Sequence, residues 1–121
     1  MARNVLGGEL QACCFSPVTG FYRDGHCKTA PDDIGTHVIC AQVTQAFLEF
    51  SRSQGNDLIA PEPLYNFPGL RPGDRWCLCA FRWREAMLAD AAPLIVLEAT
   101  HEKALQFVPL EVLLKYALDV Q

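Results

Sequence analysis

The sequence predicts an α+β domain in which a small mixed or antiparallel sheet packs against one long central helix and two shorter helices. Residues 75–80 alternate as a strand does, with Trp76 and Leu78 on one face and Cys77 and Cys79 on the other. Apolar residues recur at helical spacing between residues 32 and 53, and residues 94–97 are a continuous apolar run that is typical of a buried strand.

Length and composition favour one globular domain that spans residues 1–121. The chain has 121 residues, of which 50% are hydrophobic and 20% are charged, which is ordinary for a globular protein. It has no run of about 18 apolar residues that would cross a membrane. The first residues lack the apolar stretch of a signal peptide. We therefore expect a cytoplasmic protein that does not contact a membrane.

Little regular structure is expected before residue 29. Residues 4–6 suit a short strand that ends at Gly7-Gly8. Asp24-Gly25 is a hairpin signal between residues 21–23 and 26–28, although the flanking segments are so short that a tight loop is an equal alternative.

The clearest helix is expected from about residue 32 to residue 53. Thr29 or Asp32 can cap its start, Pro31 suits its first turn, and Gly55-Asn56 can end it. The apolar positions surround most of its first half, which indicates a central helix against a sheet. This placement makes His37 and Cys40 neighbours at i and i+3 near buried surface.

A proline- and glycine-rich excursion follows, at about residues 55–74. Half of the eight prolines fall within twelve of its residues, so neither regular helix nor central strand is possible there. A structureless stretch of this length in a compact domain is either a lid over a binding site or a passive loop held by its own aromatic residues.

The last third of the chain is predicted to alternate between helix and strand. A helix at residues 82–90 follows the strand at 75–80. After the buried strand at 94–97 and a turn at 100–103, residues 105–108 form either the partner strand or one helical turn capped by Thr100. Pro109 then opens a final helix that runs to about Asp119.

The six cysteines are expected to be reduced. They make up about 5% of the chain, below the roughly 8% that indicates a disulfide scaffold. Without a secretion signal, free and partly buried thiols are the expectation.

Charge is distributed unevenly. The net charge of −4 argues against a general nucleic-acid binder. The segment between Arg71 and Arg84 nevertheless has four arginines and one aspartate, interleaved with aromatic residues. This cluster leaves open an anion or RNA binder that uses Arg71, Arg75, Arg82 and Arg84.

Several motifs resemble a bacterial family catalogued as domain of unknown function 2237. They cover nearly the whole chain, from Thr19-Gly20-Phe21-Tyr22-Arg23-Asp24-Gly25 and Cys27 through residues 33–40 and 55–58 to residues 67–70, 72–79 and 97–102. The resemblance implies a complete, cytosolic domain of bacterial type. It implies no activity, because the family is uncharacterised.

The sharpest catalytic hypothesis is a cysteine nucleophile. Cys27 precedes the expected long helix, whose N-terminal dipole would favour a thiolate. His37 is then the candidate base, and either Arg23 or the helix amides would hold an anion.

A second group of residues suggests a ligand pocket between the long helix and the 75–80 strand. Its candidate ligand-binding residues are Cys40, Trp76, Cys77, Cys79 and Trp83. No metal site is expected, because neither Cys-x-Cys nor His-x-x-Cys matches a common zinc spacing. If a metal did bind, its ligands would come from Cys27, His37, Cys40, Cys77, Cys79 and His101.

These observations favour a small binding or accessory module with a pocket lined by cysteine and histidine. Its partner is an unknown small molecule or protein, and its cofactor is unknown. The alternatives are a small enzyme that uses Cys27 with His37 or a bound metal, and the arginine-cluster anion or RNA binder.

Overall fold

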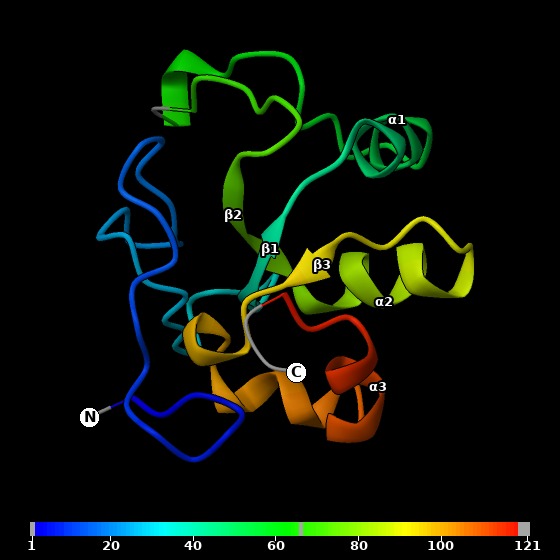
Figure 1. The fold of residues 1–121 in the computed structure, drawn as a ribbon. Helices are drawn as coiled ribbons and strands as arrows, with labels where there is room; N and C mark the ends of the chain where they lie inside the picture. The colour runs from blue at the N-terminus through cyan, green and yellow to red at the C-terminus, as the bar shows by residue number, and fades with distance from the viewer. Residues whose placement is uncertain (1, 66, 119–121) are drawn as a thin grey trace.

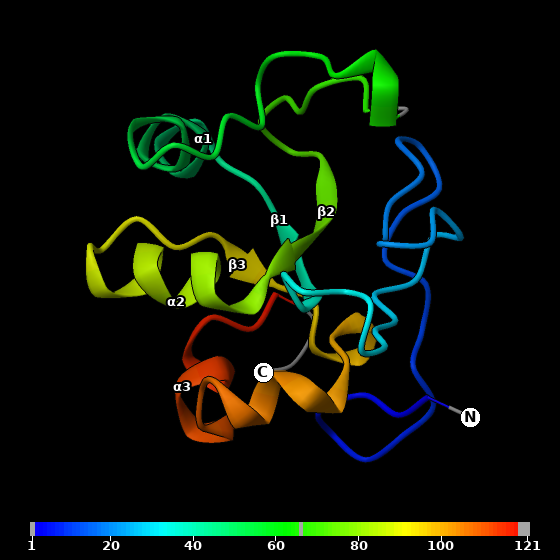
Figure 2. The same cartoon turned by 180° about the vertical axis from the view of Figure 1, so that it is seen from behind.

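A computed structural model describes residues 2–65 and 67–118. The described elements follow in the order β1 (His37–Gln42), α1 (Gln45–Ser53), β2 (Arg75–Cys79), α2 (Ala80–Leu88), β3 (Leu94–Ile95) and α3 (Leu110–Lys115), with short 3-10 helices between them. Figure 1 and Figure 2 show α1, α2 and α3 stacked along one side of the strands, with the N-terminal segment on the other side. The mixed α and β content agrees with the predicted fold class.

The sheet has three antiparallel strands in the order β2-β1-β3. β1 is the central strand, and its four inner residues are completely buried: Val38, Ile39, Cys40 and Ala41. β2 pairs with β1 so that Cys77 is opposite Cys40 and Cys79 is opposite His37. This register places chemically active side chains from two distant parts of the sequence side by side.

The predicted long helix is wrong in its first half. Residues 37–42 form β1, and α1 begins only at Gln45, where the Thr44 hydroxyl accepts a hydrogen bond from the Phe47 amide at 3.1 Å. A strand that is buried on both faces is apolar at every position, so its pattern also satisfies helical spacing. His37 and Cys40 are therefore strand residues.

The later elements follow the sequence more closely. β2 occupies the predicted strand, and α2 starts two residues before the predicted helix. The predicted partner strand at 105–108 is wrong, because residues Glu102–Gln106 form a 3-10 helix. This is closer to the alternative of one helical turn, but its N-cap is His101 and not Thr100. α3 begins one residue after Pro109. Asp119, the expected end of that helix, lies outside the described residues.

The N-terminal segment, residues 2–36, forms isolated bridges but no helix or strand where the structure describes it. The expected strand at residues 4–6 is reduced to a bridge between Asn4 and His101. Asp24-Gly25 forms a turn without a hairpin ladder, which matches the tight-loop alternative.

Two disulfides hold the N-terminal segment against the sheet. Cys13 is bonded to Cys40 of β1, and Cys27 is bonded to Cys77 of β2. These four cysteines form a small core of their own, apart from the main core between sheet and helices. The expectation of reduced thiols is thereby corrected: the fold brings together cysteines that are 27 and 50 residues apart, which spacing alone does not reveal. Cys14 and Cys79 are free.

The proline- and glycine-rich excursion has no strand and contains one 3-10 turn, Pro63–Tyr65. In Figure 1 it arches at the top of the molecule, next to the N-terminal segment. Within the described parts of the chain, no helix has the length and apolar character needed to cross a membrane.

Candidate functional site

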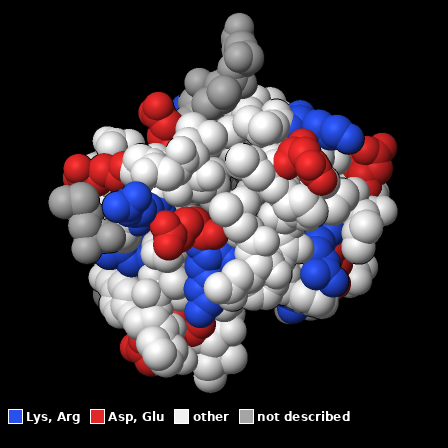
Figure 3. All heavy atoms as spheres, turned by 90° about the horizontal axis from the view of Figure 1, so that it is seen from below, with Lys and Arg blue, Asp and Glu red and all other residues white. Residues whose placement is uncertain are grey.

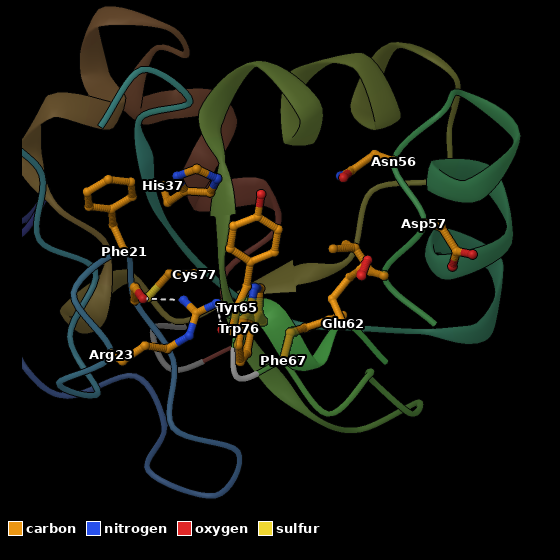
Figure 4. A pocket seen from close by; sticks show the side chains of 12 residues that line it. Phe21, Arg23, His37, Asn56, Asp57, Glu62, Tyr65, Phe67, Trp76 and Cys77 are labelled. Atoms are coloured by element: carbon orange, nitrogen blue, oxygen red, sulfur yellow. Dashed lines mark hydrogen bonds between the residues drawn. The ribbon is translucent and has the colours of Figure 1, made fainter. Parts of the chain in front are cut away.

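A cavity of about 530 Å³ lies where the N-terminal segment, the sheet and the excursion meet. Four aromatic side chains line it: Phe21, Tyr65, Phe67 and Trp76. Figure 4 shows Phe21, Arg23 and His37 on one side, Asn56, Asp57 and Glu62 on the other, and Tyr65, Trp76 and Phe67 between them. The cavity thus has apolar walls with polar groups at two ends.

Arg23 is the most constrained cation in this cavity. Its guanidinium lies 5.0 Å from the centre of the Trp76 ring, and it donates hydrogen bonds to the carbonyls of Gly20 at 2.5 Å and Tyr65 at 3.3 Å. Its Nε–H is buried and has no partner among the described residues. Burial lowers the pKa of Arg23, but arginine remains protonated at physiological pH. The site therefore contains a fixed positive charge whose buried Nε–H lacks an acceptor among the described residues.

His37 enters the cavity from β1 with its ring held by a buried carboxylate. Asp33, which is 3% exposed, accepts hydrogen bonds from His37 Nδ1 at 2.6 Å and from the His37 amide at 2.8 Å. Thr29 donates to the same carboxylate at 3.1 Å. Phe21 stacks on the ring with centroids 6.1 Å apart, and Gly35 lies so close that an added Cβ would be 2.5 Å from His37 Cε1. These contacts fix the ring orientation and leave Nε2 as the nitrogen that Asp33 does not use.

The opposite end of the cavity is acidic and exposed. Asp57 accepts hydrogen bonds from the amides of Ile59 and Ala60, and these two bonds hold the pKa of its carboxyl below the usual value of 3.8. Glu62 lies nearer the aromatic residues in Figure 4. The two ends thus differ in charge: a half-buried cation faces an exposed rim of carboxylates.

A smaller hollow of about 240 Å³ adjoins the cavity and shares His37, Trp76 and Cys77 with it. Cys79 and Arg82 also line this hollow. The thiol of Cys79 is free and half-buried, whereas the other two predicted ligand-binding cysteines, Cys40 and Cys77, are in disulfides.

The structure does not present Cys27 as a free thiol. Its sulfur is bonded to that of Cys77, the residue is completely buried, and it does not line the cavity. The proposed catalytic trio is therefore divided: Arg23 and His37 share the cavity, whereas Cys27 lies behind its wall. Cys40, predicted to bind ligand, is likewise buried and bonded to Cys13.

The sulfur atoms of Cys13, Cys27 and Cys77 lie within 4.8 Å of one another, and Cys40 is joined to them through Cys13. After reduction, four thiolates would be a donor set that zinc favours, whereas the disulfide form offers no thiolate. His37, Cys79 and His101 are outside this sulfur group. The conditional ligand set from the sequence therefore contained three of the four clustered cysteines and missed Cys13.

Trp83, another predicted ligand-binding residue, lies in the main core instead. It is completely buried, donates from Nε1 to the Pro93 carbonyl at 3.1 Å and packs edge-on against Tyr116. Trp76 on the preceding strand does line the cavity.

The arginine cluster is engaged in local contacts. Arg75 donates to the Gln42 side chain at 3.3 Å, Arg82 pairs with Glu85 at 3.3 Å, and Arg84 stacks on Phe81. On the face shown in Figure 3, basic and acidic groups are interspersed. RNA binding by the cluster remains a prediction, and a steep fall of affinity with salt would be its signature.

Sequence reasoning missed Asp33 as part of the site. An aspartate shortly after a proline is also typical of the first turn of a helix, which is the role that the pattern suggested. Its buried contact with His37 becomes visible only when residues 33–36 are seen to turn into β1.

Comparison with protein families gives one match. The family model described as "Uncharacterized protein conserved in bacteria (DUF2237)" matches residues 3–117. No curated protein matches the chain.

Proposed function

Because the chain belongs to the uncharacterised DUF2237 family, we propose its function from the site: a module that binds a small organic molecule with an anionic group and a planar body. The anionic group, a carboxylate or phosphate, lies against Arg23. The planar part lies between the aromatic side chains of the cavity.

The single observation that supports this proposal most strongly is that the Arg23 guanidinium is fixed in position and has a buried N–H with no partner among the described residues. Two backbone carbonyls and the Trp76 ring hold the guanidinium in place before any ligand arrives. A buried N–H without a partner costs free energy, and an acceptor atom on a ligand would recover it. Prior fixation also reduces the ordering entropy that binding must overcome.

The cavity walls favour a flat ligand. Trp76 and Phe67 are 6% and 8% exposed, and their rings meet edge-to-face with centroids 5.1 Å apart. Together they form the buried floor of the cavity. Phe21 and Tyr65 are more exposed and lie nearer solvent. An aromatic ring of the ligand would gain stacking and burial at the floor.

The experiment is a titration of isotope-labelled protein with three compounds of similar shape, followed by nuclear magnetic resonance. Benzoate carries an anion, benzyl alcohol is neutral and benzylamine carries a cation. We expect benzoate to bind most tightly and to shift the amide signals of residues that line the cavity.

Arg23→Met is the test variant, because it keeps length and apolar stem but removes the charge. We expect it to abolish the preference for benzoate over benzyl alcohol, while Arg84→Met, on the helix α2 surface, leaves that preference unchanged. Equal affinities of the wild type for all three compounds, or shifts outside the cavity, would refute the proposal.

A further inference from the structure

We propose that Cys79 is a nucleophilic thiol that accepts acyl groups, with His37 as its general base and Asp33 as the residue that positions His37. This inference deepens the proposed function, since the substrate would reach Cys79 from the ligand cavity. The proposed nucleophile is Cys79 and not Cys27, and the sequence suggested Cys79 only as a ligand-binding residue.

The strand register pairs the residues that carry the thiol and the imidazole. Cys79 at the end of β2 is paired with His37 at the start of β1. The register shifts just after this pair, between His37 and Ile39, so it is the shared hollow that places the two side chains near each other. Both residues line the 240 Å³ hollow next to the cavity.

The imidazole is prepared for proton transfer. Asp33 binds Nδ1 at 2.6 Å, which selects the tautomer that carries its proton on Nδ1 and leaves Nε2 as the acceptor. The same carboxylate binds the His37 amide, so ring and backbone are fixed together. A histidine oriented by a carboxylate is the base of the arrangement that activates hydroxyl and thiol nucleophiles generally, and Cys79 is the thiol that shares the hollow with it.

Cys79 is also the N-cap residue of α2, a helix of nine residues. The cap makes no side-chain hydrogen bond, and the first turn has no acidic residue. The Ala80 amide at the helix start donates to the Thr36 carbonyl at 3.0 Å, so the helix dipole, rather than this amide, favours negative charge on a thiolate or on the oxygen of a tetrahedral intermediate. Arg82 of the same turn also lines the hollow, with its charge paired to Glu85 at 3.3 Å.

The other cysteines do not share this environment. Cys13, Cys27, Cys40 and Cys77 are in disulfides. Cys14 is free and partly exposed, as Cys79 is, but it lies in the N-terminal segment and does not cap a helix. Cys14 is therefore an internal reference thiol within the same molecule.

The proposed step is an acyl transfer. The Cys79 thiol gives its proton to Nε2 of His37, and its sulfur forms a bond to the carbonyl carbon of an ester or thioester. The bond to the leaving alcohol or thiol breaks, and that group takes the proton from His37. Water then adds to the acyl-thioester with His37 as base, releasing the carboxylic acid and restoring the thiol.

The first test measures alkylation by iodoacetamide with peptide mass spectrometry across a range of pH. We expect Cys79 to react more than about tenfold faster than Cys14 near neutral pH. His37→Gln should remove this advantage. Asp33→Asn should change the pH profile of Cys79 labelling, a readout that a merely structural role would not move. Circular dichroism spectra show which variants are folded, and labelling rates are compared among those variants.

The second test uses p-nitrophenyl acetate as the acyl donor. We expect a rapid release of one equivalent of nitrophenol and an acetyl group on the peptide that contains Cys79. Cys79→Ser should lose both signals, whereas Cys14→Ser should keep them.

Equal labelling of Cys79 and Cys14 in the wild type, or acetylation that persists in Cys79→Ser, would overturn the inference. Because Cys79→Ser leaves Arg23 and the aromatic walls in place, benzoate binding by this variant separates failure of the thiol from failure of the binding proposal.

Discussion

Thr19 and Thr100 are completely buried polar residues that fix the two strand cysteines. The Thr19 hydroxyl accepts from the Cys77 amide at 2.8 Å, and the Thr100 hydroxyl accepts from the Cys40 amide at 3.2 Å. Thr100 also donates to the Val96 carbonyl at 2.8 Å. Each hydroxyl thus satisfies a backbone group beside a disulfide, which explains why these positions are polar inside the core.

His101 makes the stability of the fold depend on pH. Burial lowers its pKa below 6.5, and Lys103, whose amide donates to Nδ1 at 3.0 Å, lowers it further, whereas Glu102 opposes this shift. The unfolded chain therefore binds a proton at higher pH than the folded protein does. Stability should fall as the pH drops below 6.5, until the folded-state pKa is reached.

Urea unfolding of wild type and His101→Gln between about pH 7.5 and pH 5.5 measures this effect. We expect the variant to lose less stability than the wild type over that range. Parallel curves for His101→Gln and wild type would show that His101 does not cause the dependence.

At the scale of elements, the boundary between β1 and α1 determines whether His37 belongs to the sheet or to a helix. The chain leaves the central strand at Gln42 and enters a helix capped by Thr44. If the helix had begun at residue 32, His37 would lie on a helix and would not face Cys79. The Thr44 cap stabilises a helix that starts at Gln45, and this start leaves residues 37–42 in the strand that carries His37.

Replacing Thr44 by alanine should lower the free energy of unfolding by about 1 kcal/mol, because the Phe47 amide loses its acceptor. Urea denaturation gives this value. Thr44→Ser keeps the hydroxyl and should retain most of the stability; an equal loss in both variants would mean that the threonine methyl, not the cap, is responsible.

At the scale of the whole molecule, the two disulfides hold residues 2–36 against the sheet. The structure describes no helix or strand in this segment. The disulfides cross-link this segment to adjacent positions of β1 and β2, since Cys40 and Cys77 are paired in the sheet. Regular elements in the segment would have supplied backbone hydrogen bonds and a buried face. The disulfides stabilise the segment in a different way, because they limit the conformational freedom of the unfolded chain.

Reduction should therefore destabilise the protein strongly. Loops closed across 27 and 50 residues correspond to about 3.5 and about 4 kcal/mol if each disulfide is considered alone. Urea unfolding with and without a phosphine reductant measures the change, and intact mass without reductant checks that both bonds are present. The Cys14→Ser, Cys79→Ser double variant should show the same loss; unchanged stability on reduction would contradict a structural role.

Local sequence signals determined β2, the approximate position of α2 and the start of α3. The alternation at residues 76–78 separates Trp76 and Leu78, in the main core, from Cys77 in the cysteine cluster. Pro109 marks the start of α3. These features depend on backbone preferences and on spacing within a few residues, so they can be read without the fold.

Tertiary structure alone decided that residues 37–42 are a strand, which cysteines are bonded and where the cavity lies. The sequence identified His37, Arg23, Trp76 and Cys79 as candidate site residues, but not that Cys79 shares a hollow with His37 or that Asp33 holds the His37 ring. An apolar run is compatible with both helix and strand, and partners that are 27 to 60 residues apart are chosen by packing. The reason is physical: side-chain chemistry is local, whereas register and burial depend on the whole chain.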